Sequence, residues 1–563
     1  MPTVYVNDKP VEIGAEKLNC VQVAAMAGVE VPHYCYHPAL SIVASCRMCL
    51  IEMGDLKDGK VTMQGKVFPG CQTPVKDGTV IVTGDYAKRD ASVKALQYDP
   101  AYKPGDKTKK AQADTLEGLL LNHPLDCPVC DKAGECKLQD YSYEYGHGES
   151  RMMDPKNQPA NKPDLSSKIT LFTDRCILCT RCVRFTREIS GTSELQVVGR
   201  GHHEEIDVFP GYPLENKLSG NVVDLCPVGA LGSKDFLYTQ RVWYLKTTDN
   251  VCAGCSTGCS IHTDANKDIV YRLRPRENLE NQGYFMCDEG RWGYHYTNAP
   301  NRITRPLTRI EGSLKPTDWQ SLAKLKVTFE QAVFVTAKKS VAVLSPFLTV
   351  EEAYRLGSAF KSMNPDIRLV LGPVPVAGED DHYPKDVRGQ AVEPTKFTIR
   401  AEKCPNRMGV ESVLRKLQGD VIAFASAVNQ PLDAMWFAGG YPNPDAVNAA
   451  ISDNWIAPKL LIVQDLFHSK LTRAASTVLP ATTAFEKDGT FVNYAGYVQS
   501  FHRSVKAPAE VRSELQLAYD LAGTKGLATV AAVRKDFVKD LPQYASLAEI
   551  ATKSNGRLTL ATV

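Results

Sequence analysis

Cysteine is the residue whose number and spacing in this sequence point most directly to chemistry. The chain of 563 residues contains 17 cysteines, and 16 of them precede residue 288. Apart from Cys20 and Cys404, they form four groups with short gaps between neighbours. In a reducing compartment, cysteines spaced in this way are better explained as metal thiolates than as disulfides. The sequence therefore predicts four metal centres, all in its first half or just beyond it.

The first group has a spacing close to that of plant-type ferredoxins. Its members, with 10, 2 and 21 residues between them, are Cys35, Cys46, Cys49 and Cys71. Plant-type 2Fe-2S ferredoxins use C-x4-C-x2-C with a distant fourth cysteine, so the first gap is longer here. We expect a loop to supply three thiolates and a strand edge to supply the fourth, with Arg47 offsetting part of their negative charge. A zinc site, which also uses four thiolates, is the alternative.

The second group contains the one predicted ligand that is not a cysteine. Its members, with 3, 2 and 5 residues between them, are His123, Cys127, Cys130 and Cys136. They follow an apolar run at residues 119–121. Three cysteines with one histidine are also a common zinc set, and a histidine in this place could be a surface residue at a helix end. Both alternatives stay open on spacing alone.

The third group has the most specific pattern. Its members are Cys176, Cys179, Cys182 and Cys226. Three cysteines at two-residue gaps and a fourth followed by proline, here Pro227, match the logic of a 4Fe-4S cubane in bacterial ferredoxins. Because 43 residues separate the last two ligands, the pattern indicates a two-cluster fold that has lost one cluster. Arg175, Arg181 and Arg184 could moderate the cluster's charge, or they could form a solvated basic face.

The fourth group ends the cysteine-rich part of the chain. Its members, with 2, 3 and 27 residues between them, are Cys252, Cys255, Cys259 and Cys287. Gly254 and Gly258 suit a loop that must wrap tightly around a metal centre. A zinc ribbon is the alternative for this group.

The segments around the first three groups are predicted to be β-rich and then helical. Residues 4–6 and 11–13 indicate two strands around a turn, followed by a helix at residues 21–27. Residues 98–110 and 154–164 combine prolines with charged residues and are predicted linkers on either side of a short helical module.

The second half of the chain has a different pattern. Apolar runs at residues 341–344, 368–371, 421–424 and 460–463 alternate with helical stretches such as residues 351–362. This alternation predicts an α/β region with a mostly parallel sheet.

Composition excludes some classes of partner. The net charge is +2, so no strong field points to nucleic acid or to an anionic membrane surface. No apolar run approaches the roughly 20 residues that span a bilayer, and the N-terminus lacks a basic segment followed by an apolar one. We therefore expect a soluble, cytoplasmic chain that binds no nucleic acid.

With these four groups in this order, the sequence resembles the large iron-sulfur subunit, of the G type, of bacterial NADH:quinone oxidoreductase (complex I). The resemblance is strong over residues 1–300 and weaker beyond. It implies a 2Fe-2S cluster on the first group and a 4Fe-4S cluster on each of the second and third. The fourth group is similar to the extra 4Fe-4S site that some bacterial members retain and to the cluster domain of molybdopterin oxidoreductases.

The second half also resembles molybdopterin oxidoreductases, in a shortened form. The resemblance rests on the segments GGYPNP at 439–444, VLP at 478–480 and EKDGTFVN at 486–493. Two features depart from that pattern: residues 304–563 are about half as long as the pterin-binding domains, and Glu289 replaces a basic residue often found two places after the last cysteine. We therefore expect a degenerate domain without molybdopterin.

The predicted architecture is an α+β N-terminal half followed by an α/β C-terminal half. The resemblance implies a β-grasp 2Fe-2S ferredoxin-like domain at 1–100, a histidine-ligated 4Fe-4S module at 101–155, a bacterial-ferredoxin-like 4Fe-4S domain at 156–245, a molybdopterin-oxidoreductase-type 4Fe-4S domain at 246–303 and the degenerate domain at 304–563.

The function implied by the resemblance is electron relay. Electrons would arrive from a flavin-bearing NADH-oxidising subunit with its small 2Fe-2S partner and leave toward quinone through downstream iron-sulfur subunits of the peripheral arm. The membrane arm would be contacted only indirectly, at the cytoplasmic face of the inner membrane. No P-loop, Rossmann or flavin motif is evident, so no catalytic residue is assigned. The alternatives are the equivalent subunit of an NAD-linked hydrogenase or formate dehydrogenase, and a zinc-stapled scaffold.

Overall fold

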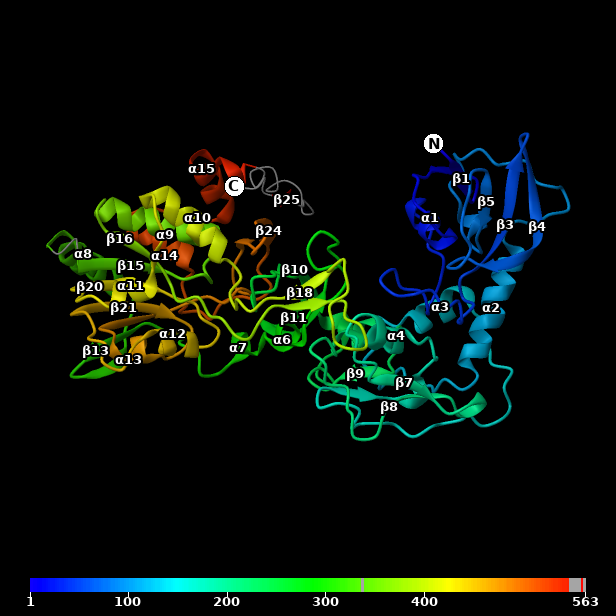
Figure 1. Ribbon diagram of the computed structural model, residues 1–563, viewed down its shortest axis with the longest axis horizontal. Helices are drawn as coiled ribbons and strands as arrows, with labels where there is room; N and C mark the ends of the chain where they lie inside the picture. The colour runs from blue at the N-terminus through cyan, green and yellow to red at the C-terminus, as the bar shows by residue number, and fades with distance from the viewer. Residues whose placement is uncertain (336–338, 546–557, 560–563) are drawn as a thin grey trace. The chain divides into compact units, whose positions relative to one another are not determined.

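The computed structural model describes residues 1–335, 339–545 and 558–559, which fall into two units (Figure 1). The first unit comprises residues 1–244 and 384–392, and the second comprises residues 245–383 and 393–563. Within the described residues, no helix combines the length and the apolar character needed to cross a membrane.

The first unit begins with a five-stranded mixed sheet in the order β2-β1-β5-β3-β4. Its strands are β1 Thr3–Val6, β2 Lys9–Glu12, β3 Leu50–Lys57, β4 Lys60–Pro69 and β5 Thr79–Val82. Strand β1 pairs antiparallel with β2 and parallel with β5. Helix α1 (Cys20–Met26) packs its buried face into the same apolar core, and Asn19 and Gln22 cap its first turn reciprocally. The predicted pair of strands and the helix after it are confirmed.

The predicted linker at residues 98–110 is wrong in its second part, because α2 (Asp106–Leu120) begins inside it. The buried face of this helix includes Thr108 and Gln112, and Thr108 donates both its backbone N–H and its hydroxyl to Glu52 Oε2 (3.0 Å each). Polar residues on the buried face conceal the apolar period that would have predicted a helix. Helix α3 (Lys137–Tyr145) completes the expected helical module, and residues 154–164 contain no helix or strand.

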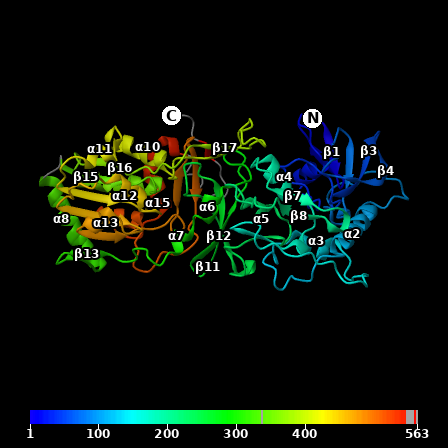
Figure 2. The ribbon, with the colours of Figure 1, turned by 60° about the horizontal axis from the view of Figure 1, so that its bottom comes forward.

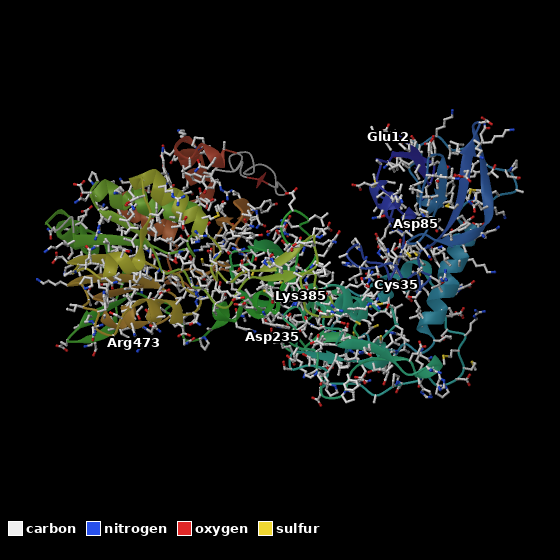
Figure 3. The ribbon with its side chains drawn as sticks, in the orientation of Figure 1. Glu12, Cys35, Asp85, Asp235, Lys385 and Arg473 are labelled. Carbon is white, nitrogen blue, oxygen red and sulfur yellow. The ribbon has the colours of Figure 1, made fainter. Side chains whose placement is uncertain are left out.

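Short elements make up the rest of the first unit (Figure 2). They are β6 Ile169–Leu171, α4 Arg181–Glu188, β7 Leu195–Val198, β8 Glu205–Val208, α5 Asn221–Leu225 and β9 Leu231–Ser233. Strands β6 and β9 form one antiparallel pair, and β7 and β8 form another. Lys385, labelled in Figure 3, donates its backbone N–H to the carbonyl of Ile189 (2.9 Å), so residues 384–392 return to this unit.

The second unit begins with a three-stranded antiparallel sheet in the order β10-β11-β12. Its strands are β10 Lys246–Val251, β11 Ser260–Asn266 and β12 Ile269–Pro275, and α6 (Asp288–Trp292) and α7 (His295–Asn298) follow. Asp264 is buried in this sheet and accepts hydrogen bonds from Thr247 (2.6 Å), Arg272 (2.7 Å) and Arg274 (2.8 Å).

An eight-stranded sheet in the order β14-β13-β22-β21-β20-β15-β16-β19 forms the centre of the second unit. Its strands are β13 Leu307–Ile310, β14 Ser313–Pro316, β15 Ser340–Leu344, β16 Arg368–Leu371, β19 Ile422–Ala423, β20 Ala434–Ala438, β21 Leu460–Asp465 and β22 Thr477–Pro480. The strands from β22 to β19 run parallel, and β13 and β14 add an antiparallel edge. The predicted parallel α/β region is confirmed. The run at 421–424 forms only the short strand β19, because α11 begins at Phe424.

Helices cover both faces of this sheet (Figures 1 and 2). They are α8 Leu322–Val335, α9 Val350–Met363, α10 Arg407–Gln418, α11 Phe424–Val428, α12 Asp445–Ala450, α13 Lys470–Ala474, α14 Glu514–Leu521 and α15 Val530–Asp540. On β15, Ala342 and Leu344 join the apolar cluster of α8, α9, α10, α14 and α15, whereas Val341 and Val343 join that of α11, α12 and α13. Burial on both faces explains why these strands are continuous apolar runs in the sequence.

The remaining strands of the second unit form two small antiparallel sheets. Strand β17 (Asp381–Tyr383) pairs with β18 (Phe397–Ile399). Strands β23 (Gly489–Val492), β24 (Tyr497–Phe501) and β25 (Leu558–Thr559) form the other sheet.

Candidate metal centres

The four thiols of the first group come from the loop after α1 and from the end of β4. Cys35, Cys46 and Cys49 lie in the loop, and Cys71 lies two residues beyond β4 (Figure 3 labels Cys35). The backbone N–H of Cys35 donates to Cys46 Sγ (3.4 Å). Hydrogen bonds from the thiols of Cys46 and Cys71 hold the pKa of Cys35 well below its usual range. The structure therefore brings this group together, while Arg47 is exposed with a left-handed backbone (φ 58°).

The second group lies between α2 and α3. Cys130 and Cys136 are buried and Cys127 is exposed. The charge of Cys127 contributes to a raised pKa of Cys130, and the charge of Cys130 contributes to a raised pKa of Cys136, although burial is the largest cause in both. His123 follows the end of α2, and its Nδ1 is buried without a hydrogen-bond partner among the described residues.

The environment of His123 favours a neutral imidazole. Burial, together with the charges of Lys156 and Arg175, lowers the pKa of His123 to about 4. A neutral imidazole with an unpartnered ring nitrogen is suited to metal ligation. The charges that shift the pKa of His123 are those of Lys156, Arg175 and Asp126, and none of the three thiols is among them.

The third group surrounds a small cavity, which its four thiols line together with Leu171, Ile206 and Val228. The backbone N–H of Leu178 donates to Cys176 Sγ (3.4 Å). Leu178 and Thr180 both have a left-handed backbone (φ 50° and 58°), which L-residues seldom adopt, and this lets the turn wind around the cavity. Burial raises the pKa of Cys176 to about 12.

The arginines around the third group do not form a solvated basic face, so that alternative is wrong. Arg175 and Arg184 are only 5% and 3% exposed. Arg175 pairs with Asp126 (2.9 Å), the residue before Cys127. Their charges are held inside the unit because backbone carbonyls and a carboxylate from distant segments satisfy their donors.

The fourth group also surrounds a small cavity, lined by its four buried thiols with Met286 and Phe397. Backbone N–H groups of Gly254 and Gly290 donate to Cys252 Sγ (3.5 Å) and Cys287 Sγ (3.3 Å). A Cβ at Gly290 would lie 3.0 Å from Cys252 Sγ, so a side chain there would crowd the space between the thiols.

The thiol groups fit metal clusters by three features. All 17 cysteines are free, the thiols of the third and of the fourth group each line one cavity, and backbone N–H groups point at sulfurs of the first, third and fourth groups, which favours the charged thiolate. Soft thiolate donors select iron-sulfur clusters or zinc, so the geometry alone leaves both open. The ungrouped Cys20 and Cys404 are buried in the two units, and burial raises the pKa of both thiols.

Two features beside the fourth group were not predicted from the sequence. Glu289 pairs with Lys403 (2.6 Å), so a lysine from a distant segment supplies the positive charge that the local sequence lacks. A cavity of about 800 Å³ lies beyond Gly254 and Glu289, and Phe347, Pro373 and Tyr441 also line it. These last residues follow the carboxyl ends of β15, β16 and β20, where parallel sheets commonly bind ligands. The pairing with Lys403 has no signal in the local sequence, whereas Tyr441 belongs to the segment 439–444 on which the resemblance rests.

Comparison with known families places each ligand group inside a matched segment. Residues 2–86 match a 2Fe-2S iron-sulfur cluster binding domain, and residues 112–151 match the NADH-ubiquinone oxidoreductase-G iron-sulfur binding region. Residues 166–232 match the ferredoxin-like domain of NADH-quinone oxidoreductase subunit 3, and residues 245–299 match the molybdopterin oxidoreductase Fe4S4 domain. Residues 406–524 match molybdopterin oxidoreductase. The chain therefore has 2Fe-2S and 4Fe-4S binding domains and a molybdopterin oxidoreductase-like C-terminal region.

Curated relatives carry names that agree with the predicted resemblance. The G-type subunit of NADH-quinone oxidoreductase from Rickettsia conorii is 34% identical over 64% of this chain and 49% of its own length. The protein of the same name from Streptomyces coelicolor is 33% identical over 59% of this chain and 36% of its own length. The NADH-ubiquinone oxidoreductase 75 kDa subunit of Reclinomonas americana is 35% identical over 57% of this chain and 42% of its own length. The chain thus spans less than half the length of these relatives, and the predicted resemblance is confirmed.

Proposed function

We propose that this chain is an electron-relay subunit of a bacterial NADH:quinone oxidoreductase. The observation that carries the proposal is that four separate donor groups each lie inside a segment that matches an iron-sulfur domain. The chain would take electrons from a flavin-bearing NADH-oxidising subunit with a small 2Fe-2S partner. It would pass them toward quinone through downstream iron-sulfur subunits of the peripheral arm.

The cofactor assignment follows the four groups. The first group would hold a 2Fe-2S cluster, and the second, third and fourth would each hold a 4Fe-4S cluster, with His123 as the only ligand that is not a thiolate. When bound, such clusters accept and release single electrons. The chain's own residues bury most of the thiols, direct backbone N–H groups at sulfurs of the third and fourth groups and exclude larger side chains beside Cys130 and Cys252. No molybdopterin is assigned to the C-terminal region.

Contacts within the first unit support a relay, because the third group touches the surroundings of the second. The backbone N–H of Lys137 donates to the carbonyl of Pro227 (3.0 Å), which joins the segment after Cys136 to the segment after Cys226. A Cβ at Gly229 would collide with Cys130 Sγ, so only glycine permits this approach. Short separation between carriers is what a relay requires.

The assignment extends to boundaries and location. We place the five domains at 1–100, 101–155, 156–245, 246–303 and 304–563. The subunit would lie in the peripheral arm at the cytoplasmic face of the inner membrane and would contact the membrane arm only through other subunits.

Iron and sulfide analysis of anaerobically purified protein tests the proposal. Four clusters of these types contain roughly 14 irons per chain, 2 in the 2Fe-2S cluster and 12 in three cubanes. A value near that number is expected, and stoichiometric zinc with little iron would contradict the relay. Affinity purification with mass spectrometry then tests the parent complex: quinone-reductase subunits are expected, whereas hydrogenase subunits would favour the alternative parent.

A further inference from the structure

Helix α4 presents three polar side chains to the ligand loop of the first group. They are Arg181, Arg184 and Glu188, which lie on one face of the helix at positions i, i+3 and i+7. Glu188 accepts hydrogen bonds from both the backbone N–H (2.8 Å) and the hydroxyl (2.6 Å) of Ser41. The helix also carries Cys182 of the third group, so one element contacts both ligand groups.

Arg184 makes the most direct of these connections. Its Nη2 donates to the carbonyl of Cys35 (2.5 Å) and to the carbonyl of Cys179 (3.1 Å), and both of these residues are predicted ligands. Its Nη1 donates to the carbonyl of Ser41 (2.5 Å). One guanidinium therefore joins a ligand of the first group to a ligand of the third through two hydrogen bonds on the same nitrogen.

Arg181 supports the same junction from the preceding turn of the helix. Its Nη2 donates to the carbonyl of Tyr36, the residue after Cys35. Its Nη1 donates to the carbonyl of Leu225 (3.3 Å), the residue before Cys226. A second guanidinium thus holds the segments next to Cys35 and Cys226, which leaves little freedom for the loop to move relative to the helix.

The charge of Arg184 has no carboxylate partner within the part of the chain that the structure describes. Its acceptors are three backbone carbonyls and the hydroxyl of Thr180 (3.4 Å), and it is 3% exposed. A buried cation is costly unless negative charge lies near it. The charge of Arg184 acts on the thiol of Cys179, a ligand of the third group, so thiolates at this junction would supply negative charge, which gives a reason for an arginine rather than a neutral donor in this position.

We infer that Arg184 is a positioning residue that sets the spacing of the first and third clusters and tunes both of their reduction potentials together. The inference rests on the proposed function and deepens it. The planar guanidinium fixes the ligand loop on the ligand helix through carbonyls, as lysine with its single ammonium cannot. Its positive charge favours the added electron at each cluster, so both potentials depend on one side chain.

The test compares Arg184→Met and Arg184→Lys in the purified complex by redox-titrated electron paramagnetic resonance and hydrogen-deuterium exchange. Arg184→Met removes the charge and the hydrogen bonds, so the midpoint potentials of the 2Fe-2S cluster and the third-group cluster both shift downward. Exchange of the amides at residues 35–41 rises as well. Arg184→Lys keeps the charge, so its potentials lie closer to those of the wild type while exchange still rises.

Arg187→Met is the matched control, because Arg187 lies on the same helix with a side chain that is 57% exposed and pairs only with Glu188 among the described residues. It removes one positive charge and is expected to leave both potentials unchanged. Equal shifts in Arg187→Met and Arg184→Met, or a shift at one cluster alone, would overturn the inference. If Arg184→Met does not retain its clusters, Arg184→Lys decides: exchange at 35–41 like that of the wild type overturns the positioning role.

The failure of this inference differs from the failure of the proposed function. A wild-type complex without a 2Fe-2S signal contradicts the cluster assignment itself. A wild-type complex with both signals, together with an Arg184→Met complex of unchanged potentials and exchange, leaves the relay standing and removes only the role of Arg184.

Discussion

The two units of the chain bury their ligand groups in different surroundings. In the second unit, the fourth group lies beside a three-stranded sheet and an eight-stranded sheet whose two faces are covered by large apolar clusters. In the first unit beyond residue 100, the strands are three or four residues long, and buried cysteines and arginines share the interior with leucines, isoleucines and valines. Ligand cysteines are therefore a larger share of the buried residues there than in the second unit.

Removal of the metal is expected to produce the largest difference in amide protection between the two units. We expect anaerobic chelation to lower amide protection most across residues 101–244, since metal binding supplies folding free energy and ligand cysteines are a larger share of the buried residues there. Strands β15 and β20 should keep their protection, because their burial does not depend on thiolates. Hydrogen-deuterium exchange of the holo and chelated protein measures both. Equal loss of protection in the two units would remove the distinction.

A buried ion pair in the second unit provides the next largest effect. Lys487 lies 2.9 Å from Glu352 and 3.9 Å from Glu514, and all three side chains are almost fully buried. Lys487→Met leaves two carboxylates without their cation, so it should lower the free energy of unfolding of this unit by about 3–5 kcal/mol. Denaturant titration that follows the second unit provides the measurement.

Lys470→Met is the control for that variant, because Lys470 pairs with the exposed Asp453. Water and salt screen an exposed pair, so only a small change is expected. If both variants lowered the free energy of unfolding equally, burial of Glu352 and Glu514 would not make the loss of their cation costly.

The acid sensitivity of the three-stranded sheet should be smaller and depend on pH. Burial alone would raise the pKa of Asp264, but the hydrogen bond and charge of Arg274 and the charge of Arg272 outweigh it and lower the pKa to about 2. An acid with a depressed pKa stabilises the fold above its unfolded pKa near 3.9, and this contribution disappears as the pH falls toward about 2. The contribution is about 2 kcal/mol at neutral pH.

Asp264→Asn isolates this contribution from other titrating groups. The variant should be less stable than the wild type at pH 7, and the difference should shrink between pH 4 and pH 2. Denaturant titration at several pH values measures the difference. A difference that is constant with pH would show that the two arginines do not set the ionisation of Asp264.

Much of the architecture could be predicted from the sequence because its signals are local. Short cysteine gaps identify ligand turns such as the one from Cys176 to Cys182, and continuous apolar runs identify strands buried on both faces, such as β15. Helix α2 was missed at its start because the buried residues of its first two turns, Thr108 and Gln112, are polar, with Thr108 bonded to Glu52.

The remaining features depend on contacts between distant segments. Arg184 looks like a surface residue in a basic stretch, and only the fold brings the carbonyl of Cys35, 149 residues away, to its guanidinium. Lys403 likewise reaches Glu289 across 114 residues. No spacing rule contains such pairs, because both partners are chosen by the packing of elements rather than by the local chain.

The smallest expected effect concerns His123, which distinguishes the second group from the thiolate-only fourth group in the other unit. A neutral imidazole puts one less negative charge on a cluster than a thiolate does, so His123→Cys should keep the cluster and lower its reduction potential. The pKa of about 4 and the unpartnered Nδ1 support a neutral ligand. Redox-titrated electron paramagnetic resonance measures the potential. His123→Ala should weaken assembly of that cluster, whereas His147→Ala, at an exposed histidine of the same module, should not. An unchanged signal and potential in both His123 variants would show that this histidine is a helix-end residue and that another group completes the site.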